Sequence, residues 1–448
     1  MRILRIWLII LVVFQVACSV EDESANPAPA NPLGQFEYID RINGQEIGSC
    51  CFYGGNILGA DSEGNVIVLM MKSFEIFANR YDVNSGWGTP VKLDNTNNSS
   101  NIPLIAVAAN GNALALWSNI TLTNYYLSHY DRKLGWAEPI TIKPTDNQVV
   151  KNLSVSVDAD ENYHLVWSEK PVDGTVQARS VKYNLFLPAS GLSMEKIISE
   201  STDWPAGTTI NVNSKGDGFA TWLQKSGTSD IHKWHTAKYS SVNGWSLPEE
   251  MVSGSEGTLG MSVDLNGEFQ FVVDSDGEGF YAYQQSRDTS SSTYEDDIFT
   301  HHYTNSSGLS MGELLIVDAP GRISMPQTGI SGDDTIMLVW NEGDYFSQQS
   351  WYRLFNKATG WTTRKKIGDR FVDRLSVNMH GNAIVYKNEY SDGRYHFLIN
   401  RYTKINGWAG FKEVDIGDLE IPTNVEIILD EQNVITATFD NLSARIPF

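Results

Sequence analysis

The stretch RYDVNSGWGTPVKL, residues 80–93, recurs along nearly the whole chain. Each copy has an aromatic residue, a polar tip, and a glycine followed by tryptophan or leucine. Because glycine tolerates the left-handed backbone that ends a short hairpin loop, each copy predicts a β-hairpin. The further copies are HYDRKLGWAEPITI (129–142), KYSSVNGWSLPEEM (238–251), HYTNSSGLSMGELL (302–315), LFNKATGWTTRKKI (354–367), RYTKINGWAGFKEV (401–414) and the looser KYNLFLPASGLSMEKI (182–197).

A second repeated element alternates with the first. Each copy is a tight polar turn that opens into a run of apolar residues, which is typical of a strand covered on both faces. The copies are DSEGNVIVLM (61–70), NGNALALW (110–117), DADENYHLVW (158–167), NSKGDGFATW (213–222), DLNGEFQFVV (264–273), SGDDTIMLVW (331–340), NMHGNAIVY (378–386) and DEQNVITATF (430–439).

Together the two elements predict an all-β fold. The second element forms the inner hairpin of each repeat, and the first element, with its Gly-Trp turn, forms the outer hairpin. Together they make a four-stranded antiparallel sheet, which is the blade of a β-propeller. The alternation predicts eight blades, with seven blades and an accessory hairpin as the alternative. The last blade lacks its outer strand, and we expect FEYIDRI (36–42) to supply it and so close the ring, because an open ring would expose unpaired sheet edges. Residues 275–299 are expected to form an insertion between the second and third strands of the fifth blade.

The first 18 residues have the pattern of an export signal. Arg2 and Arg5 give a positive start, and the unbroken apolar run Ile6–Phe14 that follows them is too short to span a bilayer. The run ends in Val16-Ala17-Cys18, and this ending resembles the lipobox of bacterial lipoproteins, whose cysteine becomes the lipid-modified first residue. Gln15 departs from the lipobox pattern, so a plain secretory signal is the alternative.

With the propeller repeats, this ending makes the chain similar to bacterial β-propeller lipoproteins in general. The resemblance covers residues 36–448 and implies an exported protein that is lipid-modified at Cys18. Ser19, directly after the cysteine, is compatible with an outer-membrane destination, facing the periplasm or the cell surface. Residues 19–34 are polar and proline-rich, which predicts a flexible tether before a single propeller domain at 35–448.

The charge of the exported chain limits its partners. Without Arg2 and Arg5 it has 31 basic and 54 acidic residues, a net charge of −23. Such a chain repels nucleic acid and anionic lipid, which leaves proteins, glycans and cations. We expect a monomeric propeller that contacts the membrane only through its N-terminal lipid.

The adjacent Cys50 and Cys51 are either a vicinal disulfide or two small buried residues.

The two faces of such a propeller differ in their connections. The turns that join strands one to two and three to four lie on one face, whereas the other connections lie on the opposite face. The tight repeated turns fall on the first face and the variable loops on the second, where binding usually occurs. The aromatic residues expected in variable segments are candidates for stacking a sugar or anchoring a protein. They are Trp204, Trp234, Tyr281, Tyr294, Tyr345, Phe346, Tyr390 and Tyr395.

One segment carries the alternating carboxylates of a calcium loop. Asp274, Asp276 and Glu278 stand at alternate positions before a glycine, which is the oxygen-rich arrangement that Ca²⁺ requires. Gln285 stands where a calcium loop of the EF-hand type has a bidentate glutamate. A solvated acidic turn is the structural alternative, and no other cofactor is expected.

The sequence therefore favours a binding or scaffold protein of the cell envelope, which recognises a protein or a glycan through its variable loops, over an enzyme. No catalytic residue is assigned. The alternative is a glycan-active enzyme, either sialidase-like or another propeller glycosidase or lyase. Ser156-Val-Asp158 begins like a sialidase Asp box, but its glycine and tryptophan do not follow in register. Arg370 and Arg374 fall near variable loops, and a cluster of arginines with a carboxylate pair would favour the enzyme.

Overall fold

The structure is a computed structural model. It describes residues 38–41, 57–72, 74–94, 100–172, 179–201, 205–225, 232–251, 269–287, 295–316, 323–343, 349–414, 425–439 and 442–447. The chain divides into two units, Met1–Gly34 and Gln35–Phe448. The predicted signal, the lipid site at Cys18, the tether and the Cys50-Cys51 pair all lie outside the described residues.

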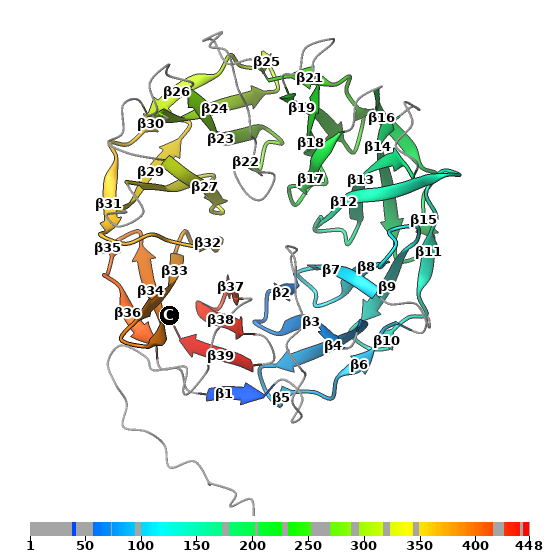
Figure 1. The fold of residues 1–448 in the computed structure, drawn as a ribbon, viewed down its shortest axis with the longest axis horizontal. Coiled ribbons are helices and arrows are strands. Elements are labelled where there is room, and N and C mark those ends of the chain that lie inside the picture. Colours follow the sequence, from blue (N-terminus) through cyan, green and yellow to red (C-terminus); the bar gives the residue numbers. More distant parts are fainter. Residues whose placement is uncertain are drawn as a thin grey trace, which may run out of the picture. The chain divides into compact units, whose positions relative to one another are not determined.

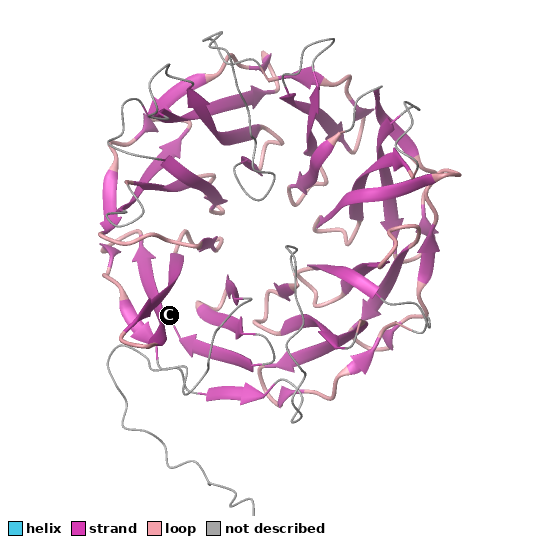
Figure 2. Cartoon of the chain, in the orientation of Figure 1, coloured by secondary structure: helices cyan, strands magenta, loops and turns pink. Residues whose placement is uncertain are grey.

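The described residues form eight antiparallel sheets that follow one another in chain order (Figure 1). Every regular element among them is a strand (Figure 2). In this part of the chain, accordingly, no helix has the length and apolarity needed to cross a bilayer.

The first four sheets occupy residues 58–250. Sheet one has β2 (Leu58–Ala60), β3 (Val66–Lys72), β4 (Glu75–Asp82), β5 (Gly86–Trp87) and β6 (Val91–Lys92). Sheet two has β7 (Ser100–Val107), β8 (Ala113–Asn119), β9 (Tyr125–Asp131), β10 (Gly135–Trp136) and β11 (Ile140–Ile142). Sheet three has β12 (Gln148–Val157), β13 (Tyr163–Pro171), β14 (Arg179–Leu187), β15 (Gly191–Leu192) and β16 (Lys196–Ser201). Sheet four has β17 (Ala206–Val212), β18 (Gly218–Lys225), β19 (His232–Ser240), β20 (Gly244–Trp245) and β21 (Glu249–Glu250).

The remaining sheets reach the C-terminus. Sheet five has β22 (Phe269–Val273), β23 (Gly279–Arg287), β24 (Glu295–Thr304), β25 (Gly308–Leu309) and β26 (Glu313–Ile316). Sheet six has β27 (Ile323–Ile330), β28 (Ile336–Glu342), β29 (Gln349–Asn356), β30 (Gly360–Trp361) and β31 (Lys365–Gly368). Sheet seven has β32 (Arg374–Val377), β33 (Ala383–Ser391), β34 (Arg394–Thr403), β35 (Gly407–Trp408) and β36 (Lys412–Val414). Sheet eight has β37 (Val425–Leu429), β38 (Val434–Phe439), β39 (Leu442–Pro447) and β1 (Tyr38–Arg41).

Seven of the sheets share one plan. In sheet one, both β5 and β6 pair with β4, so the two short pieces form one interrupted outer strand. The same double pairing recurs in sheets two to seven. Each of these sheets is thus a four-stranded antiparallel blade whose fourth strand is broken, and the expectation of an all-β propeller built from such blades is confirmed.

The eighth sheet combines the two ends of the described chain. Its outer strand is β1, which pairs antiparallel with β39 from Tyr38 opposite Arg445 to Arg41 opposite Leu442. The segment that makes this pairing lies within residues 36–42, where the sequence predicted the missing strand.

The apolar core consists of layers between successive sheets. In the layer between sheets one and two, Ile67 and Leu69 from β3 pack with Ala115 and Trp117 from β8. Equivalent layers lie between each later pair of sheets, up to sheets seven and eight. The tryptophans that recur on the second strands are fully buried and fill the space between neighbouring sheets; they are Trp117, Trp167, Trp222 and Trp340.

The inner turns share one hydrogen-bonded design. In the turn Asp61–Asn65, the Asp61 N–H donates to the Asn65 carbonyl (2.9 Å), and the Asp61 carboxylate accepts the N–H groups of Glu63 and Asn65. Short polar side chains cap turns in this way, which explains why Asp or Asn opens most copies. The fourth position has a positive φ in every copy, at Gly64, Gly111, Glu161, Gly216, Gly277, Asp334, Gly381 and Asn433.

Hydrogen bonds between these turns join every pair of successive sheets. Main-chain bonds run from Ser62 to Ala109 (3.1 Å), from Ala159 to Ser214 (3.1 Å) and from Gly332 to Met379 (2.8 Å). The Asn213 amide donates to the Asp274 carbonyl (2.8 Å). From sheet eight, the Gln432 amide donates to the Ser62 carbonyl of sheet one (2.8 Å), and Arg445 donates to the Gly64 carbonyl (3.1 Å).

The three remaining junctions use the side chains at the strained fourth position. The Glu161 carboxylate lies within 2.9 Å of Asn110 Nδ2, Asn112 Nδ2 and His129 Nε2, all from sheet two. Asp334 accepts the N–H and hydroxyl of Ser275 (2.9 and 2.6 Å). Asn433 Oδ1 accepts the amides of Asn378 and Asn382 (2.9 and 2.8 Å). A left-handed backbone costs a non-glycine residue about 1–2 kcal/mol, and here bonds to the preceding sheet offset it.

The fifth repeat differs from the prediction. Phe269–Val273 is the first strand β22, and residues 274–278 are the inner turn that leads into the second strand β23. The sequence DLNGE at 264–268 resembles the turn so closely that it was predicted to be the turn. The expected insertion at 275–299 is therefore wrong, because most of its described residues belong to this turn and to the paired strands β23 and β24.

Replacing Glu161 with glycine tests the balance between strain and inter-sheet bonding. We expect Glu161→Gly to lower the free energy of unfolding by about 1–2 kcal/mol, since three inter-sheet contacts outweigh the relief of one left-handed residue. Glu161→Gln retains an acceptor oxygen and should fall between. Denaturant unfolding measures both changes, and a glycine variant as stable as the parent would contradict this account.

Candidate functional site

The repeated turns all lie on one face of the propeller, here called the turn face. In sheets one, two, four and five, a main-chain N–H of the outer turn donates to a side chain of the inner turn of the same sheet. Val83 N donates to Asn65 Oδ1 (3.0 Å), and Arg132 N donates to Asn112 Oδ1 (2.8 Å). The same bond joins Ser241 to Asp217 and Asn305 to Glu278.

The other connections meet at the opposite ends of the strands, here called the loop face. Between strands two and three of sheet two, the Leu122 carbonyl accepts the Val150 N–H of sheet three (3.2 Å). In sheet six, the Asn341 side chain accepts the Val372 N–H (2.9 Å), which binds the sheet to the connection that follows it. The described residues thus have the two-sided arrangement that the sequence predicted.

The predicted aromatic contacts have different outcomes. Tyr281 is fully buried, and its hydroxyl lies 3.0 Å from Thr236 Oγ1, so it is a core residue and its assignment to the loops is wrong. Trp234 stacks on Phe269 at 4.0 Å between sheets four and five, which is also a packing role. Tyr390 and Tyr395 do lie on the loop face. Four further candidates lie outside the described residues: Trp204, Tyr294, Tyr345 and Phe346.

Tyr390 and Tyr395 form an aromatic pair on a short rigid hairpin. They stand opposite each other on β33 and β34, with ring centroids 4.8 Å apart. The turn between them has positive φ at Asp392 (52°) and Gly393 (82°), as a type I′ hairpin requires. Tyr390 is 63% exposed, so the pair offers an aromatic surface to solvent in a fixed position.

Charged residues lie near this pair on sheets seven and eight and on the connection that leads into sheet seven. Glu389, adjacent to Tyr390, forms ion pairs with Arg370 and with Lys387 (3.6 Å). Arg374, at the start of β32, lies 3.7 Å from Glu426 of β37. Sequence reasoning had noted the two arginines but had missed their carboxylate partners. We call the set Arg370, Asp373, Arg374, Lys387, Glu389, Tyr390, Tyr395 and Glu426 the loop-face cluster.

Two carboxyl groups of the loop-face cluster hold their protons unusually well. Burial raises the pKa of Asp373, although its carboxylate accepts the Asn388 N–H (2.8 Å). Burial also raises the pKa of Glu426, against the opposing effect of Arg374. The pKa of Lys387 is lowered by burial and by the nearby Arg370. Perturbed groups concentrated in one place are typical of functional sites.

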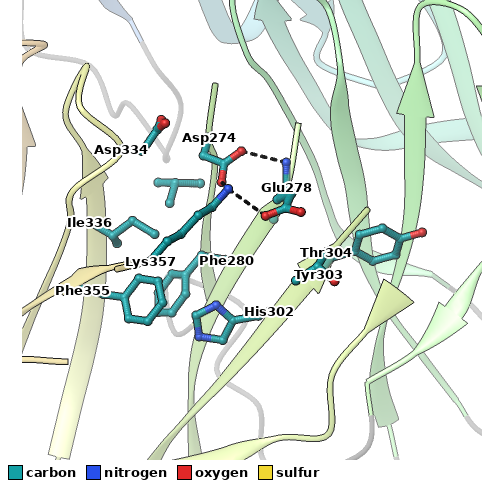
Figure 3. Close-up of a pocket in the computed structure, with 12 residues that line it drawn as sticks. Asp274, Glu278, Phe280, His302, Tyr303, Thr304, Asp334, Ile336, Phe355 and Lys357 are labelled. Carbon is teal, nitrogen blue, oxygen red and sulfur yellow. Dashed lines mark hydrogen bonds and ion pairs between the residues drawn. The ribbon is translucent and has the colours of Figure 1, made fainter. Parts of the chain in front are cut away.

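A cavity of about 210 Å³ lies on the turn face, between sheets five and six. Three aromatic rings form its apolar side, with centroid separations of 4.9 Å for Phe280 and His302, 4.7 Å for His302 and Phe355, and 5.9 Å for Phe280 and Phe355. Figure 3 shows these rings below the side chain of Lys357, whose ammonium group lies between Asp274 and Glu278. The lining residues are Val272, Asp274, Glu278, Gly279, Phe280, His302, Tyr303, Thr304, Asp334, Ile336, Phe355 and Lys357.

The predicted calcium ligands converge on this lysine. Lys357 Nζ lies 2.6 Å from Asp274, 3.2 Å from Asp276 and 2.7 Å from Glu278. Although burial opposes both shifts, these bonds raise the pKa of Lys357 and lower that of Glu278. No cluster of three or more acidic, histidine or cysteine side chains in the described part of the chain is arranged to hold a metal. The calcium expectation is thus corrected: the three carboxylates bind the ammonium of the next sheet.

Comparisons with known proteins do not identify a family for this chain. No family model and no curated protein matches the sequence. Similar solved structures include a PL25 ulvan lyase, with 11% identity and a TM-score of 0.49 over 75% of this chain and 90% of that chain. The polysaccharide lyase Uly1 has 10% identity and a TM-score of 0.48 over 84% and 93%. The β-propeller domain of the Trilobed protease from Pyrococcus furiosus, described as having an open velcro topology, has 11% identity and a TM-score of 0.44 over 82% and 96%.

The pH dependence of stability tests the environment of Glu426. Because burial raises the pKa of Glu426, its unfavourable effect on stability is absent below its ordinary pKa of 4.5, grows as the pH rises above 4.5, and is complete once the pH has passed the folded value. We expect Glu426→Gln to match the parent near pH 4 and to be more stable at pH 7. Denaturant unfolding across this range measures the difference, and a parent that is the more stable form at pH 7 would contradict the burial argument.

Proposed function

We propose that this protein is a recognition propeller that binds a protein or a glycan through its loop face. The observation that carries the proposal is the exposed Tyr390–Tyr395 pair, held on a tight hairpin beside the charged residues of the loop-face cluster. Aromatic rings with exposed faces stack on sugar rings and also anchor protein partners. Neighbouring arginine, lysine and carboxylate groups supply hydrogen bonds around such an anchor.

The rigidity of this hairpin supports the proposal in energetic terms. Binding loses free energy when side chains and loops must be ordered on contact. The type I′ turn and the pairing of β33 with β34 already fix the two rings before a partner arrives. A partner therefore meets a surface that needs little reorganisation.

The proposed setting is the cell envelope. The lipobox-like ending at Cys18 and the polar segment 19–34 support a lipid-anchored exported protein, with the outer membrane as the destination and a secreted protein as the alternative. The acidic net charge supports attachment through the lipid alone, because the chain itself is repelled by anionic lipid. We propose that the propeller acts as a monomer on this tether.

We further propose that the propeller has eight blades and is closed by its N-terminal strand. The pairing of β1 with β39 supports this, as do the bonds from Gln432 and Arg445 of sheet eight to sheet one. A closed ring has no unpaired edge between its first and last strands, which favours solubility and stability.

A glycan-active enzyme is the second candidate, favoured by Asp373 and Glu426. Both are buried carboxyl groups with raised pKa values, and Arg374 acts on each of them electrostatically. Such groups are typical of general acids in glycan chemistry. Turnover of a glycan that is lost in Asp373→Asn would favour the enzyme over the binding protein.

Removing the aromatic pair tests the recognition proposal. We expect the double variant Tyr390→Ala and Tyr395→Ala to lose at least about tenfold in affinity, a loss typical of central aromatic anchors. A glycan array and an envelope pull-down with the exported chain measure it. Met379→Ala, which changes a residue that is 63% exposed on the turn face, is the control and should bind normally. Retained binding by the double variant would remove the proposal.

Removing residues 36–42 tests the closure of the ring. We expect the loss of β1 to lower the free energy of unfolding by about 2 kcal/mol or more, because β39 becomes an exposed edge. A chain that begins at residue 35 and keeps β1 is the control. Equal melting temperatures for the two chains would favour a propeller that does not need this strand.

A further inference from the structure

The cavity between sheets five and six plays no part in the loop-face proposal, since it lies at the other ends of the strands. Among the residues that line it, Asp274, Glu278 and Asp334 carry three negative charges against the single ammonium of Lys357. His302 adds no charge at neutral pH, because burial lowers its pKa. Anionic ligands such as phosphates or carboxylates are therefore disfavoured here.

The opposite side of the cavity is apolar and aromatic. Phe280 is buried, and its ring contacts both His302 and Phe355. Val272 and Ile336 complete this side. Aromatic faces attract cations as well as apolar groups, and the attraction is larger where water is excluded. The cavity thus presents aromatic rings on one side and excess negative charge on the other.

The carboxylates already show how an ammonium fits this place. Asp274, Asp276 and Glu278 bind Lys357 Nζ at 2.6, 3.2 and 2.7 Å. Each carboxylate oxygen of Asp334 accepts one hydrogen bond from Ser275 and keeps a further lone pair for a ligand. The volume of about 210 Å³ sets the size of a ligand. Since a benzene molecule fills an apolar cavity of about 150 Å³, there is room here for one ring and a short arm.

We propose that this cavity binds a small primary amine with an aromatic or compact apolar body. The body lies against Phe280, Phe355 and His302, and the ammonium points to the carboxylates of Glu278 and Asp334. Lys357 competes with the ligand for Glu278, so its replacement strengthens binding. The proposal is independent of the loop-face function, and either can fail alone.

Calorimetric titration of the exported chain tests the ligand class with three probes of similar shape. Phenethylamine carries the positive charge, 2-phenylethanol is neutral and phenylacetate is negative. We expect phenethylamine to bind about tenfold more tightly than 2-phenylethanol, and phenylacetate to show no heat of binding. Absence of binding by the amine, or tighter binding by either other probe, overturns the proposal.

Variants locate the binding in this cavity. Phe355→Leu keeps the interface between the sheets packed but removes a ring, and should weaken phenethylamine about tenfold. Lys357→Met removes the competing ammonium and should tighten it several-fold. The matched control is Lys404→Met, which removes the equivalent lysine of the next outer turn and its ion pair with Asp333 (2.7 Å), outside this lining. Melting curves verify folding, and unchanged affinity in both cavity variants overturns the assignment.

Discussion

The hydrogen bonds between neighbouring inner turns are the constraint on which the rest of this propeller depends. Sheets that touch only through apolar side chains can slide, because the hydrophobic effect has no direction. Here each sheet is bonded to the next through a turn of fixed geometry, as in the main-chain bond from Gly332 to Met379. The turn face therefore sets the angle and height of each sheet, and the apolar layers pack in that arrangement.

This constraint explains why the two faces serve different purposes. A turn that must cap itself, accept a left-handed residue and bond to both neighbours has little freedom to vary, as the Asx bonding of Asp61 and the three partners of Glu161 illustrate. The connections on the loop face do not share a common pattern of capping and inter-sheet hydrogen bonds among the described residues. The Tyr390–Tyr395 hairpin and the ion pairs of Arg370 and Arg374 occupy this freer side. Variation is thus concentrated where a partner can be met.

The cavity on the turn face is the exception to this division. At its charged side, a lysine from the outer turn of sheet six reaches back to three carboxylates of sheet five. Related cations at the same turn position, Arg132 and Lys404, reach back to single carboxylates, Glu63 and Asp333. The ion pair that joins neighbouring sheets elsewhere is here a group of three carboxylates around Lys357, and it lies beside the aromatic residues of the cavity.

The sequence predicted the blade plan and the two faces, because turn chemistry is local and repeats visibly. It failed where two local patterns compete or where distant residues meet. DLNGE and DSDGE both satisfy the turn pattern, and only the pairing of β22 with β23 distinguishes them. With DLNGE as the turn, the sequence predicted that Tyr281 lies in a loop, whereas Tyr281 is a core residue of β23. The partner of Asp276 and Glu278 is a lysine some eighty residues away, which composition and spacing do not reveal. Likewise, Arg374 meets Glu426 only because sheets seven and eight are neighbours.

The interruption of the fourth strand has a consequence for contacts between copies of the protein. A continuous outer strand offers a row of free amide and carbonyl groups to which another chain can add. In seven sheets this row is cut into short pieces, and proline stands in three of the gaps, at Pro90, Pro139 and Pro248. Proline lacks the amide hydrogen that an added strand would need. Copies of the protein that meet at their rims are therefore poorly suited to pairing strand to strand, which disfavours the growth of fibrils.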